Sequence, residues 1–591
     1  MMKNWVNQSR LVMFVLFLLV YSSCASDVPS ILAPDRILHS GVIVTVDEDF
    51  TVAEAVAIKN GLIVAVGSDG EILSLAGANT EKIDLEGKTV LPGFNDSHLH
   101  LAWPVGEVPD PAIQRLGKVQ SIAEIVELVR QKVADTPAGE LVWMPGGPSR
   151  VEQIKERRWP TRQDLDRVSP HHPVILIFAA DHVYVTNSRG LAVAKIDRNT
   201  PQPYRRDLFG EFQIDPRTGE PTGVLTGRAA ARILRVALNV WSTQELETNM
   251  GRAIETDVIP YGITSLSDPQ NGGSPAQPIQ HAYQRLLNRK DGLPARINLM
   301  IRLPVRSLST QDSLDLIDSL LYAPPLKNDF LRVGTFKIAL DKGRPGQEPY
   351  IVPAEKGKRV LIEGHKKGWQ LYVHITTPQT FDYACQALEE AYRLYPREDA
   401  RHIFTHINQP TRENLQTMKR LGIIADLQVN SIYHLADDVE KTRTLNPQRP
   451  DLGPKPVATY RDMGIPVILS SDQAPIGPLF TVWEAVNRVR KSGKVFQPEE
   501  RLTLQEAIRA ITITSAWTFF EDDVKGSIEE GKYADLVVLG RNILTINPLE
   551  IKDIPVLMTM TNGKFVYVNP NRDPNQKVEY LRYPARTSYL N

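Results

Sequence analysis

The chain has 591 residues, of which 42% are hydrophobic and 23% are charged, a composition typical of a globular protein. Its length exceeds what one hydrophobic core usually supports, so we expect one large domain of ~250 residues or more together with smaller ones. The 68 Lys and Arg residues nearly balance the 69 Asp and Glu residues, and no basic run concentrates charge. Nucleic acid is therefore not expected as a partner.

Residues 1–26 have the pattern of a secretion signal. Lys3 and Arg10 precede the apolar run LVMFVLFLLV, which is too short to anchor the chain across a hydrocarbon core of ~30 Å. We expect cleavage near Cys24 and export to the periplasm or the extracellular space. Cys24 lies where a lipoprotein signal places its acylated cysteine, so lipid anchoring and soluble export both remain open, beside an uncleaved anchor helix. Only Cys385 would then remain, which excludes an intramolecular disulfide.

Both ends of the remaining chain carry short β-type runs separated by turn signals. The runs GVIVTV and AVAIKNGLIVAVG lie within residues 35–90, and TNGKFVYVN lies within residues 520–575. Each end contains an Asn-Gly pair, at Asn60 and at Asn562, which favours a tight hairpin. We expect the two ends to form one small β-sandwich domain.

The middle of the chain, residues 91–519, alternates short apolar strands with helical stretches, which predicts a parallel β/α fold. Eight strands can be placed, the number that closes a TIM (β/α)8 barrel. They cover residues 92–100, 262–268, 295–303, 330–340, 370–375, 401–407, 423–429 and 465–472. The segment of about 103–260 is too long for an ordinary connection, so we expect an inserted lid or subdomain that shapes a substrate pocket.

Groups that can bind a metal lie at the carboxyl ends of five of these strands. The first strand ends in VLPGFNDSHLH, where His98 and His100 point to the same face and could share one cation. The others are Lys337 on the fourth strand, His374 on the fifth, His406 on the sixth and Asp472 on the eighth. Each alone has an ordinary explanation, such as a core histidine or a helix cap. Because barrel closure gathers these strand ends at one mouth, the set predicts a metal site.

The segment LPGFNDSHLH and the ordered set His-x-His, Lys, His, His, Asp resemble the two-metal members of the amidohydrolase superfamily. The segments HVYVTNSRGL (182–191) and PTGVLTGRA (221–229) are similar to those of its YtcJ-like, amidohydrolase-3 branch, which includes N-substituted formamide deformylases. The resemblance extends from Asp35 to Val568. It implies a metal-dependent hydrolase built on a TIM barrel.

The resemblance also implies a role for each residue of the set. His98, His100 and Asp472 would bind one divalent cation, and His374 and His406 would bind a second. Lys337 would bridge the two as a carbamate. Zinc suits these ligands, although manganese, iron or cobalt could occupy such a site.

The reaction that the resemblance implies is hydrolysis of an amide-type C–N bond in a small molecule, such as an N-formyl or N-acyl amine. The metals would activate a water for attack on the carbonyl. Asp472 would serve as the base that takes the proton of this water and passes it to the leaving amine.

Two other functions remain open: hydrolysis of a cyclic amide on the same metals, and a binding or regulatory protein that keeps the barrel without turnover. The second is permitted because the segment after Lys337 reads DKGRPGQEP instead of the branch pattern DGSLGSRTA. His374 is also followed by ITTP instead of AIGD. Thr405 replaces the Glu that usually precedes the sixth-strand histidine, which removes a carboxylate that could fix an imidazole tautomer.

Three further residues are candidates for substrate binding. His182 and Asn187 match the branch pattern in the inserted segment, where they would contact substrate or support the subdomain. His434 follows the seventh strand and would approach the mouth or lie on a surface loop. The sequence leaves homo-oligomerisation open.

Overall fold

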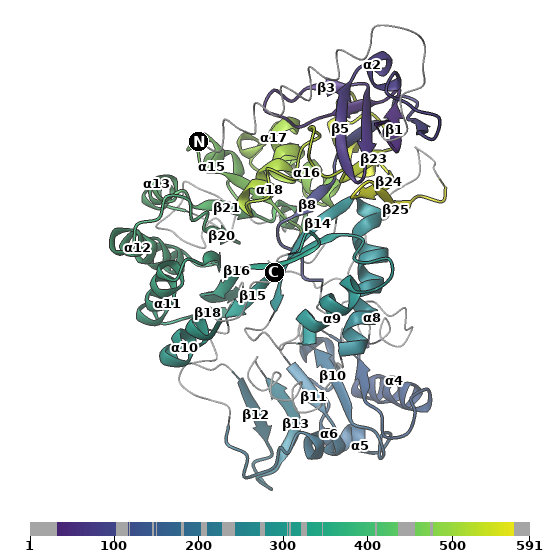
Figure 1. Ribbon diagram of the computed structural model, residues 1–591. Helices are drawn as coiled ribbons and strands as arrows, with labels where there is room; N and C mark the ends of the chain where they lie inside the picture. The colour runs from purple at the N-terminus through teal and green to yellow at the C-terminus, as the bar shows by residue number, and fades with distance from the viewer. Residues whose placement is uncertain are drawn as a thin grey trace.

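The computed structural model describes residues 32–101, 116, 119–144, 147–148, 151–178, 183–202, 210–226, 243–271, 278–303, 305, 309–320, 328–344, 347–407, 410–434, 455–472 and 477–571. The expected signal, residues 1–26 with Cys24, lies outside these ranges. Within them, none of the helices combines the length and hydrophobicity that a membrane span requires. Figure 1 shows a central barrel, with the terminal strands at the upper right and the sheet of the insertion below.

Eight parallel strands form the central sheet, in the order β22-β21-β20-β19-β16-β15-β14-β8. They are β8 (Phe94–Asp96), β14 (Ile263–Asn271), β15 (Arg296–Leu303), β16 (Leu331–Ala339), β19 (Gln370–His374), β20 (Ile403–Thr405), β21 (Ile424–Leu427) and β22 (Val467–Leu469). A bridge between Leu99 and Asp472, beyond β8 and β22, joins the two ends of this sheet. The predicted TIM barrel is confirmed, since each predicted strand overlaps one observed strand.

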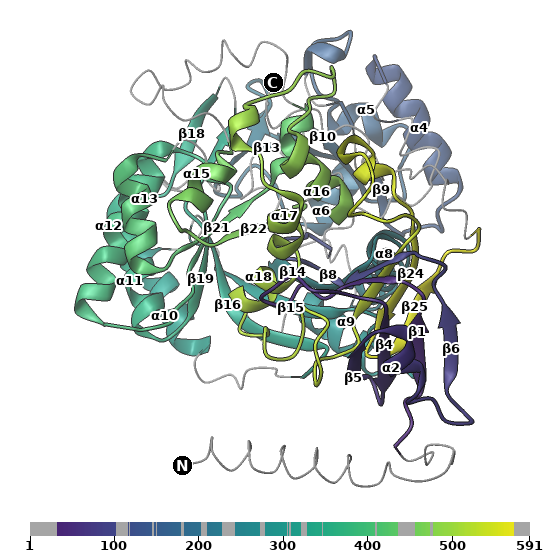
Figure 2. The same ribbon diagram turned by 90° about the horizontal axis from the view of Figure 1, so that it is seen from above.

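Apolar sequence explains why the barrel strands lie inside. Every residue of β20 and β21 is buried, as expected for parallel strands that are covered on both faces. Helices surround the strands (Figure 2): α8 (Thr243–Ala253), α9 (Pro278–Leu287), α10 (Thr310–Leu320), α11 (Ala354–Lys366), α12 (Pro378–Leu394), α13 (Arg412–Leu421), α15 (Val457–Asp462), α16 (Pro478–Asn487), α17 (Leu504–Ala510) and α18 (Ile513–Thr518). Threonine side chains fix where some helices begin: Thr377 accepts from the N–H of Thr380 at the start of α12.

Short elements complete the barrel region. The hairpin β17 (Asp341–Arg344) and β18 (Gln347–Ile351) follows β16 and contains most of the unusual segment after Lys337. The remaining short helices are η2 (Ile254–Val258), η3 (Ile259–Tyr261), η4 (Val429–His434), η6 (Pro498–Glu500) and η7 (Pro548–Asp553). Helix η4 directly follows β21, so it starts at the same end of the barrel as the predicted ligands.

Strands from both ends of the chain share a six-stranded sheet, in the order β25-β24-β23-β7-β2-β3, beside a four-stranded sheet, β5-β4-β1-β6. The elements are β1 (Arg36–His39), β2 (Val42–Val44), β3 (Val52–Ala53), β4 (Ala55–Lys59), β5 (Leu62–Gly67), α2 (Asp69–Leu73), β6 (Glu81–Asp84), β7 (Thr89–Pro92), β23 (Leu536–Leu539), β24 (Val556–Thr561) and β25 (Lys564–Val568). One apolar cluster contains Leu38 and Val56 of the smaller sheet and Val90 and Val538 of the larger one. The two sheets therefore form the expected β-sandwich from both termini.

A buried ion pair joins this sandwich to the barrel. Arg296, the first residue of β15, donates to both carboxylate oxygens of Asp535, which precedes β23, at 2.6 and 3.1 Å. The guanidinium also stacks on the ring of Tyr533, with 3.8 Å to the ring centroid. Both charged side chains are almost fully buried, so neither charge has water as an alternative partner.

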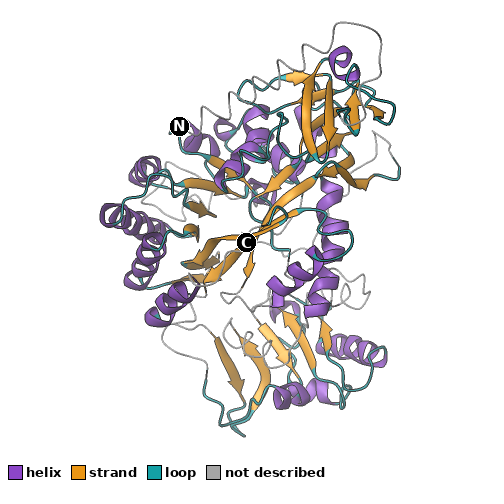
Figure 3. Ribbon diagram, in the orientation of Figure 1, coloured by secondary structure: helices purple, strands orange, loops and turns teal. Residues whose placement is uncertain are grey.

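The insertion between β8 and β14 has its own sheet, in the order β12-β13-β11-β10-β9, flanked by short helices (Figure 3). Its elements are α4 (Ile122–Ala134), β9 (Val142–Met144), η1 (Val151–Gln153), α5 (Arg162–Asp166), β10 (Val174–Phe178), β11 (Val183–Thr186), α6 (Ser188–Val193), β12 (Gly210–Ile214) and β13 (Pro221–Thr226). Two apolar clusters belong to this sheet and are separate from the barrel core. The insertion is therefore a subdomain, and its effect on a substrate pocket stays a prediction.

Candidate metal centre and active site

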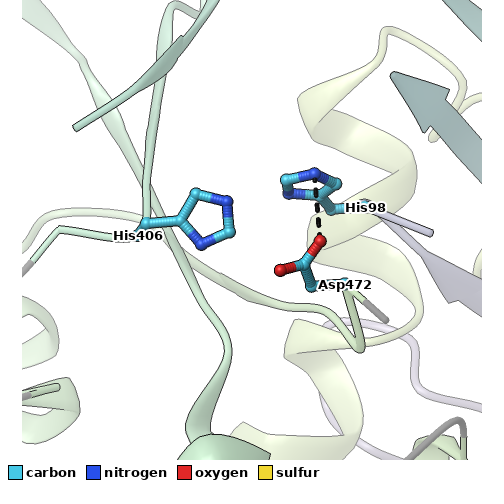
Figure 4. A group of neighbouring side chains, drawn as sticks. All are labelled: His98, His406 and Asp472. Carbon is cyan, nitrogen blue, oxygen red and sulfur yellow. Dashed lines mark ion pairs between the residues drawn. The ribbon is translucent and has the colours of Figure 1, made fainter. Parts of the chain in front are cut away.

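The six residues predicted as metal ligands all lie at the carboxyl end of the barrel. His98 and His100 follow β8, Lys337 lies on β16, His374 ends β19, His406 follows β20 and Asp472 follows β22. In Figure 4, His98, His406 and Asp472 point toward one another across a shared space. The strand-end positions that the sequence suggested therefore do meet in space.

His98 is at the centre of the first half of this cluster. Its Nε2 atom lies 3.3 Å from Nε2 of His100, 3.3 Å from Nζ of Lys337 and 3.6 Å from a carboxylate oxygen of Asp472. The same Asp472 oxygen lies 3.1 Å from Nε2 of His100. Three nitrogens and one oxygen from four separate positions thus converge on one point.

His406 and His374 extend the cluster to its other side. The centre of the His406 ring lies 5.0 Å from that of His98 and 4.4 Å from that of His374. One ligand atom from each of His98, His406 and Asp472 can be chosen so that all three lie within 4.8 Å of one another. This spacing is compatible with a shared divalent cation, whose bonds to nitrogen and oxygen are about 2.0–2.2 Å.

Two of these residues have a strained backbone. His406 and Asp472 have φ angles of 63° and 59°, in the left-handed region that residues other than glycine rarely adopt. Such a conformation costs about 1–3 kcal/mol and persists only where the surrounding structure enforces it. At Asp472 the enforcement is visible, since its N–H donates to the carbonyl of His98 and its carbonyl accepts from the N–H of His100, at 2.7 and 3.1 Å.

Burial sets the charge of the cluster. It lowers the pKa of the His98 and His406 imidazoles, and it lowers that of His100 to about 3 despite the opposing effect of Asp472. Burial would raise the pKa of Asp472, but the hydrogen bond from His100 and the adjacent imidazoles lower it below its ordinary value. Neutral imidazoles and an ionised carboxylate are the forms that bind divalent cations, so these residues fit such a cation.

A carboxylate absent from the sequence prediction lies behind His98. Asp426, on β21, is fully buried and has an oxygen 3.6 Å from Nδ1 of His98. Burial would raise its pKa, but its interactions with His98 and the hydroxyls of Tyr372 and Thr405 lower the pKa to about 2. A polar residue near the end of the apolar strand IIADLQV was the available signal, the same signal that identified the ligands on other strands.

The two unusual sequence segments contact each other. The carboxylate of Asp341, after β16, accepts hydrogen bonds from the backbone N–H and the hydroxyl of both Thr376 and Thr377, at 2.8–3.0 Å. One of its oxygens also lies 3.9 Å from Nε2 of His374. Thr376 and Thr377, which depart from the branch pattern, and Asp341, which matches it, therefore form one buried hydrogen-bonded unit beside His374.

The structure describes the three candidate substrate-binding residues to different extents. His182 lies outside the described residues, and only the backbone of His434 is described, at the end of η4. Asn187 is fully buried in the insertion: its oxygen accepts from the N–H of Val174 and of Gly190, and its nitrogen donates to the carbonyl of His172. This use of the amide favours the structural role for Asn187 over contact with substrate.

Lys455 is a second charged residue that the sequence analysis did not select. It is buried just before α15, and burial lowers its pKa to about 8 against the opposing influence of Asp426 and Asp472. Asp426 and Asp472 both favour the ammonium form of Lys455, which contributes positive charge to this end of the barrel.

Comparison with known proteins identifies the family. The sequence pattern of the amidohydrolase family matches residues 81–567, most of the chain. The protein belongs to the amidohydrolase family. As a family member it is a metal-dependent hydrolase of carbon–nitrogen bonds other than peptide bonds, which confirms the enzymatic prediction over a binding protein without turnover.

Individual amidohydrolase relatives cover nearly the whole chain. The N-substituted formamide deformylase of Arthrobacter pascens is 28% identical over 561 residues, which are 90% of this chain and 98% of that protein. YtcJ of Bacillus subtilis (strain 168) is 26% identical over 562 residues, which are 90% of this chain and 99% of YtcJ. These matches confirm the branch that the sequence motifs indicated.

A solved structure has the same overall fold. An uncharacterized metal-dependent hydrolase from Pyrococcus horikoshii OT3 superposes with a TM-score of 0.64 at 21% identity. The superposition covers 87% of this chain and 99% of that chain. The two chains therefore share their fold over most of this chain.

Proposed function

We propose that this amidohydrolase is exported and uses two divalent cations, zinc ions bridged by carbamylated Lys337, to hydrolyse a small acyclic amide of the N-formyl or N-acyl amine type. The observation that carries the proposal is the convergence of four imidazoles, a lysine and an ionised carboxylate at one end of the barrel. The deformylase relative supports this substrate class, because its name specifies an N-substituted formamide.

The residues divide between two cation positions. In this proposal His98, His100 and Asp472 would hold one cation, and His374 and His406 would hold the other. The Nζ of Lys337 lies 3.3 Å from Nε2 of His98, which belongs to the first group. An ammonium cannot ligate a cation, but the anionic oxygens of a lysine carbamate can.

Asp472 is the proposed proton carrier. Divalent cations at this site would polarise the amide carbonyl and lower the pKa of water towards ~7. Asp472 is ionised at neutral pH and is partly exposed, so it can take a proton from the attacking water. It then delivers this proton to the nitrogen of the departing amine as the C–N bond breaks. One amide and one water give one carboxylic acid and one amine.

The sequence supports export by its amino-terminal pattern. Lys3, Arg10 and the following apolar run have the composition of a cleaved signal, and Cys24 would carry lipid if the signal is of the lipoprotein type. Mass spectrometry of the mature protein would decide this part, because cleavage before or after Cys24, with or without lipid, gives different masses.

The catalytic proposal is tested with metal analysis and a single substitution. Purified wild-type protein should contain close to two metals per chain and hydrolyse at least one member of a panel of N-formyl and N-acyl amines. Asp472→Asn should lower kcat about 100- to 10,000-fold, the usual contribution of a general base, while metal is retained. Asp462→Asn, an exposed aspartate on α15, is the matched control and should leave kcat unchanged. Metal-free wild-type protein, or full turnover by Asp472→Asn, would refute the proposal.

A further inference from the structure

Resting on the proposed function, we propose that Asp426 is a positioning residue for the metal ligand His98. It acts through Thr405 and holds His98 in the tautomer that has its proton on Nδ1 and a free lone pair on Nε2. The argument depends on counting the hydrogens that each group can donate.

The carboxylate of Asp426 can only accept hydrogen bonds. One oxygen accepts from Oγ1 of Thr405 at 2.7 Å, from Nε2 of Gln428 at 2.9 Å and from the hydroxyl of Tyr372. The other oxygen accepts from the hydroxyl of Ser97 at 3.2 Å. Since Thr405 has a single hydroxyl hydrogen, its short contact with Asp426 uses that hydrogen.

Thr405 must therefore act as an acceptor toward its other neighbours. Its oxygen accepts from Nε2 of Gln428 at 3.1 Å, and it lies 3.3 Å from Nδ1 of His98. A hydrogen bond at this second position requires His98 to be the donor, which places the imidazole proton on Nδ1. The Asp426 oxygen at 3.6 Å attracts the same proton.

The contacts on the opposite side of the His98 ring also indicate that its proton is on Nδ1. Nζ of Lys337 lies 3.3 Å from Nε2 of His98. In the unmodified lysine this ammonium can only donate, so Nε2 is the acceptor, and its lone pair becomes available to a cation once Lys337 is carbamylated. Nε2 is also the nitrogen that faces His100 and Asp472, so the tautomer directs this lone pair at the position of the cation.

Strand register explains how a residue on β21 reaches a ligand that follows β8. Thr405 and Asp426 are direct partners in the parallel pairing of β20 and β21. The branch pattern has a glutamate at the position of Thr405, whereas this chain has a hydroxyl there and a carboxylate on the neighbouring strand. Donors from Thr405, Gln428, Tyr372 and Ser97 surround this carboxylate, so it acts as the acceptor of the group.

The test measures zinc affinity by competition with a chromophoric chelator, together with the visible spectrum of the cobalt(II)-substituted protein. Asp426→Asn removes the charge with almost no change of shape, and Thr405→Val removes the hydroxyl that connects Asp426 to His98. Thr335→Val is the matched control, because Thr335 is also buried on a barrel strand but donates to Gln370, at 2.9 Å, away from the ligands.

Asp426→Asn and Thr405→Val should each raise the zinc dissociation constant about 10- to 100-fold and alter the cobalt(II) spectrum, as loss of a partner behind a ligand does elsewhere. Thr335→Val should leave both unchanged, although it removes a buried hydrogen bond too. Wild-type affinity and spectrum in both site variants would refute the role of Asp426. If Asp426→Asn does not fold, Thr405→Val alone decides. A wild-type protein that binds no zinc would instead refute the proposed function.

Discussion

Two buried histidines at the end of the barrel opposite the metal cluster should make the fold sensitive to acid. The N–H of Leu371 donates to Nδ1 of His402 at 3.1 Å, Nε2 of His402 lies 2.8 Å from Nδ1 of His365, and Nε2 of His365 lies 2.8 Å from the carbonyl of Tyr395. Since the first group only donates and the last only accepts, each imidazole must donate from Nε2 and accept at Nδ1. A further proton on either ring would break a hydrogen bond of this chain.

The pKa values of both rings agree with this requirement. Burial lowers the pKa of His365 and, more strongly, that of His402, and the guanidinium of Arg397 lowers both further. Because the unfolded chain then binds more protons, the stabilisation is complete above the ordinary histidine pKa of ~6.5 and is lost as the pH falls below it. A ring that stays neutral in the folded state lowers the free energy of unfolding by about 2 kcal/mol between pH 7 and pH 5. If both rings stay neutral, the decrease is about 4 kcal/mol.

The measurement is the free energy of unfolding by urea at pH 7 and at pH 5, with excess chelator so that metal binding does not contribute. The double variant His365→Gln and His402→Gln has no imidazole to protonate at this position, whereas every other titrating group is common to both proteins. Wild-type protein should lose about 2–4 kcal/mol more than the variant between the two pH values, depending on whether one ring or both stay neutral. Equal losses would show that the two rings are not held neutral, and the reasoning from their hydrogen bonds would be wrong.

Two further predictions concern charged residues inside the barrel. Arg296→Met should reduce the free energy of unfolding by about 3–5 kcal/mol, because the buried Asp535 loses its cationic partner and keeps only the hydrogen bond from the N–H of Asn562. Adding Asp535→Leu should recover much of the loss, and equal urea stability of the single variant and wild type would refute this. Lys337→Ala should retain only one metal per chain and regain part of the second with added short carboxylic acids, and unchanged metal content by elemental analysis would exclude a bridging role for Lys337.

The barrel could be predicted because its strands are short runs of buried apolar residues. Such runs stand out from the amphipathic helices between them, and the ends of parallel strands meet at one mouth by geometry alone. His374 and Asp472 could therefore be assigned to one site without knowledge of any distance. The left-handed backbone at His406 and Asp472 could not be predicted, since neither residue type requires it. At Asp472 it accompanies the pairing with Leu99 that closes the barrel.

Asp426 and Asn187 show where sequence reasoning is limited. The role of Asp426 depends on its pairing with Thr405, and this register between two strands is not encoded in the apolar pattern of either strand. Asn187 belongs to a motif shared with the branch, which left a substrate contact and a structural role both open. Only its buried hydrogen bonds to Val174, Gly190 and His172 reveal a residue that organises the subdomain.

The departures from the branch pattern change the surroundings of the metal cluster but not the cluster itself. Thr376 and Thr377 depart from the branch pattern, and in the structure both donate to Asp341, which matches the pattern in the other segment. The carboxylate of Asp341 is buried and fully used in these contacts, which leaves it no hydrogen-bonding capacity for a substrate. Chemistry at the scissile bond should therefore follow the family, whereas recognition of the rest of the substrate must come from other residues. A substrate screen should accordingly vary the amine and acyl groups widely around a fixed amide.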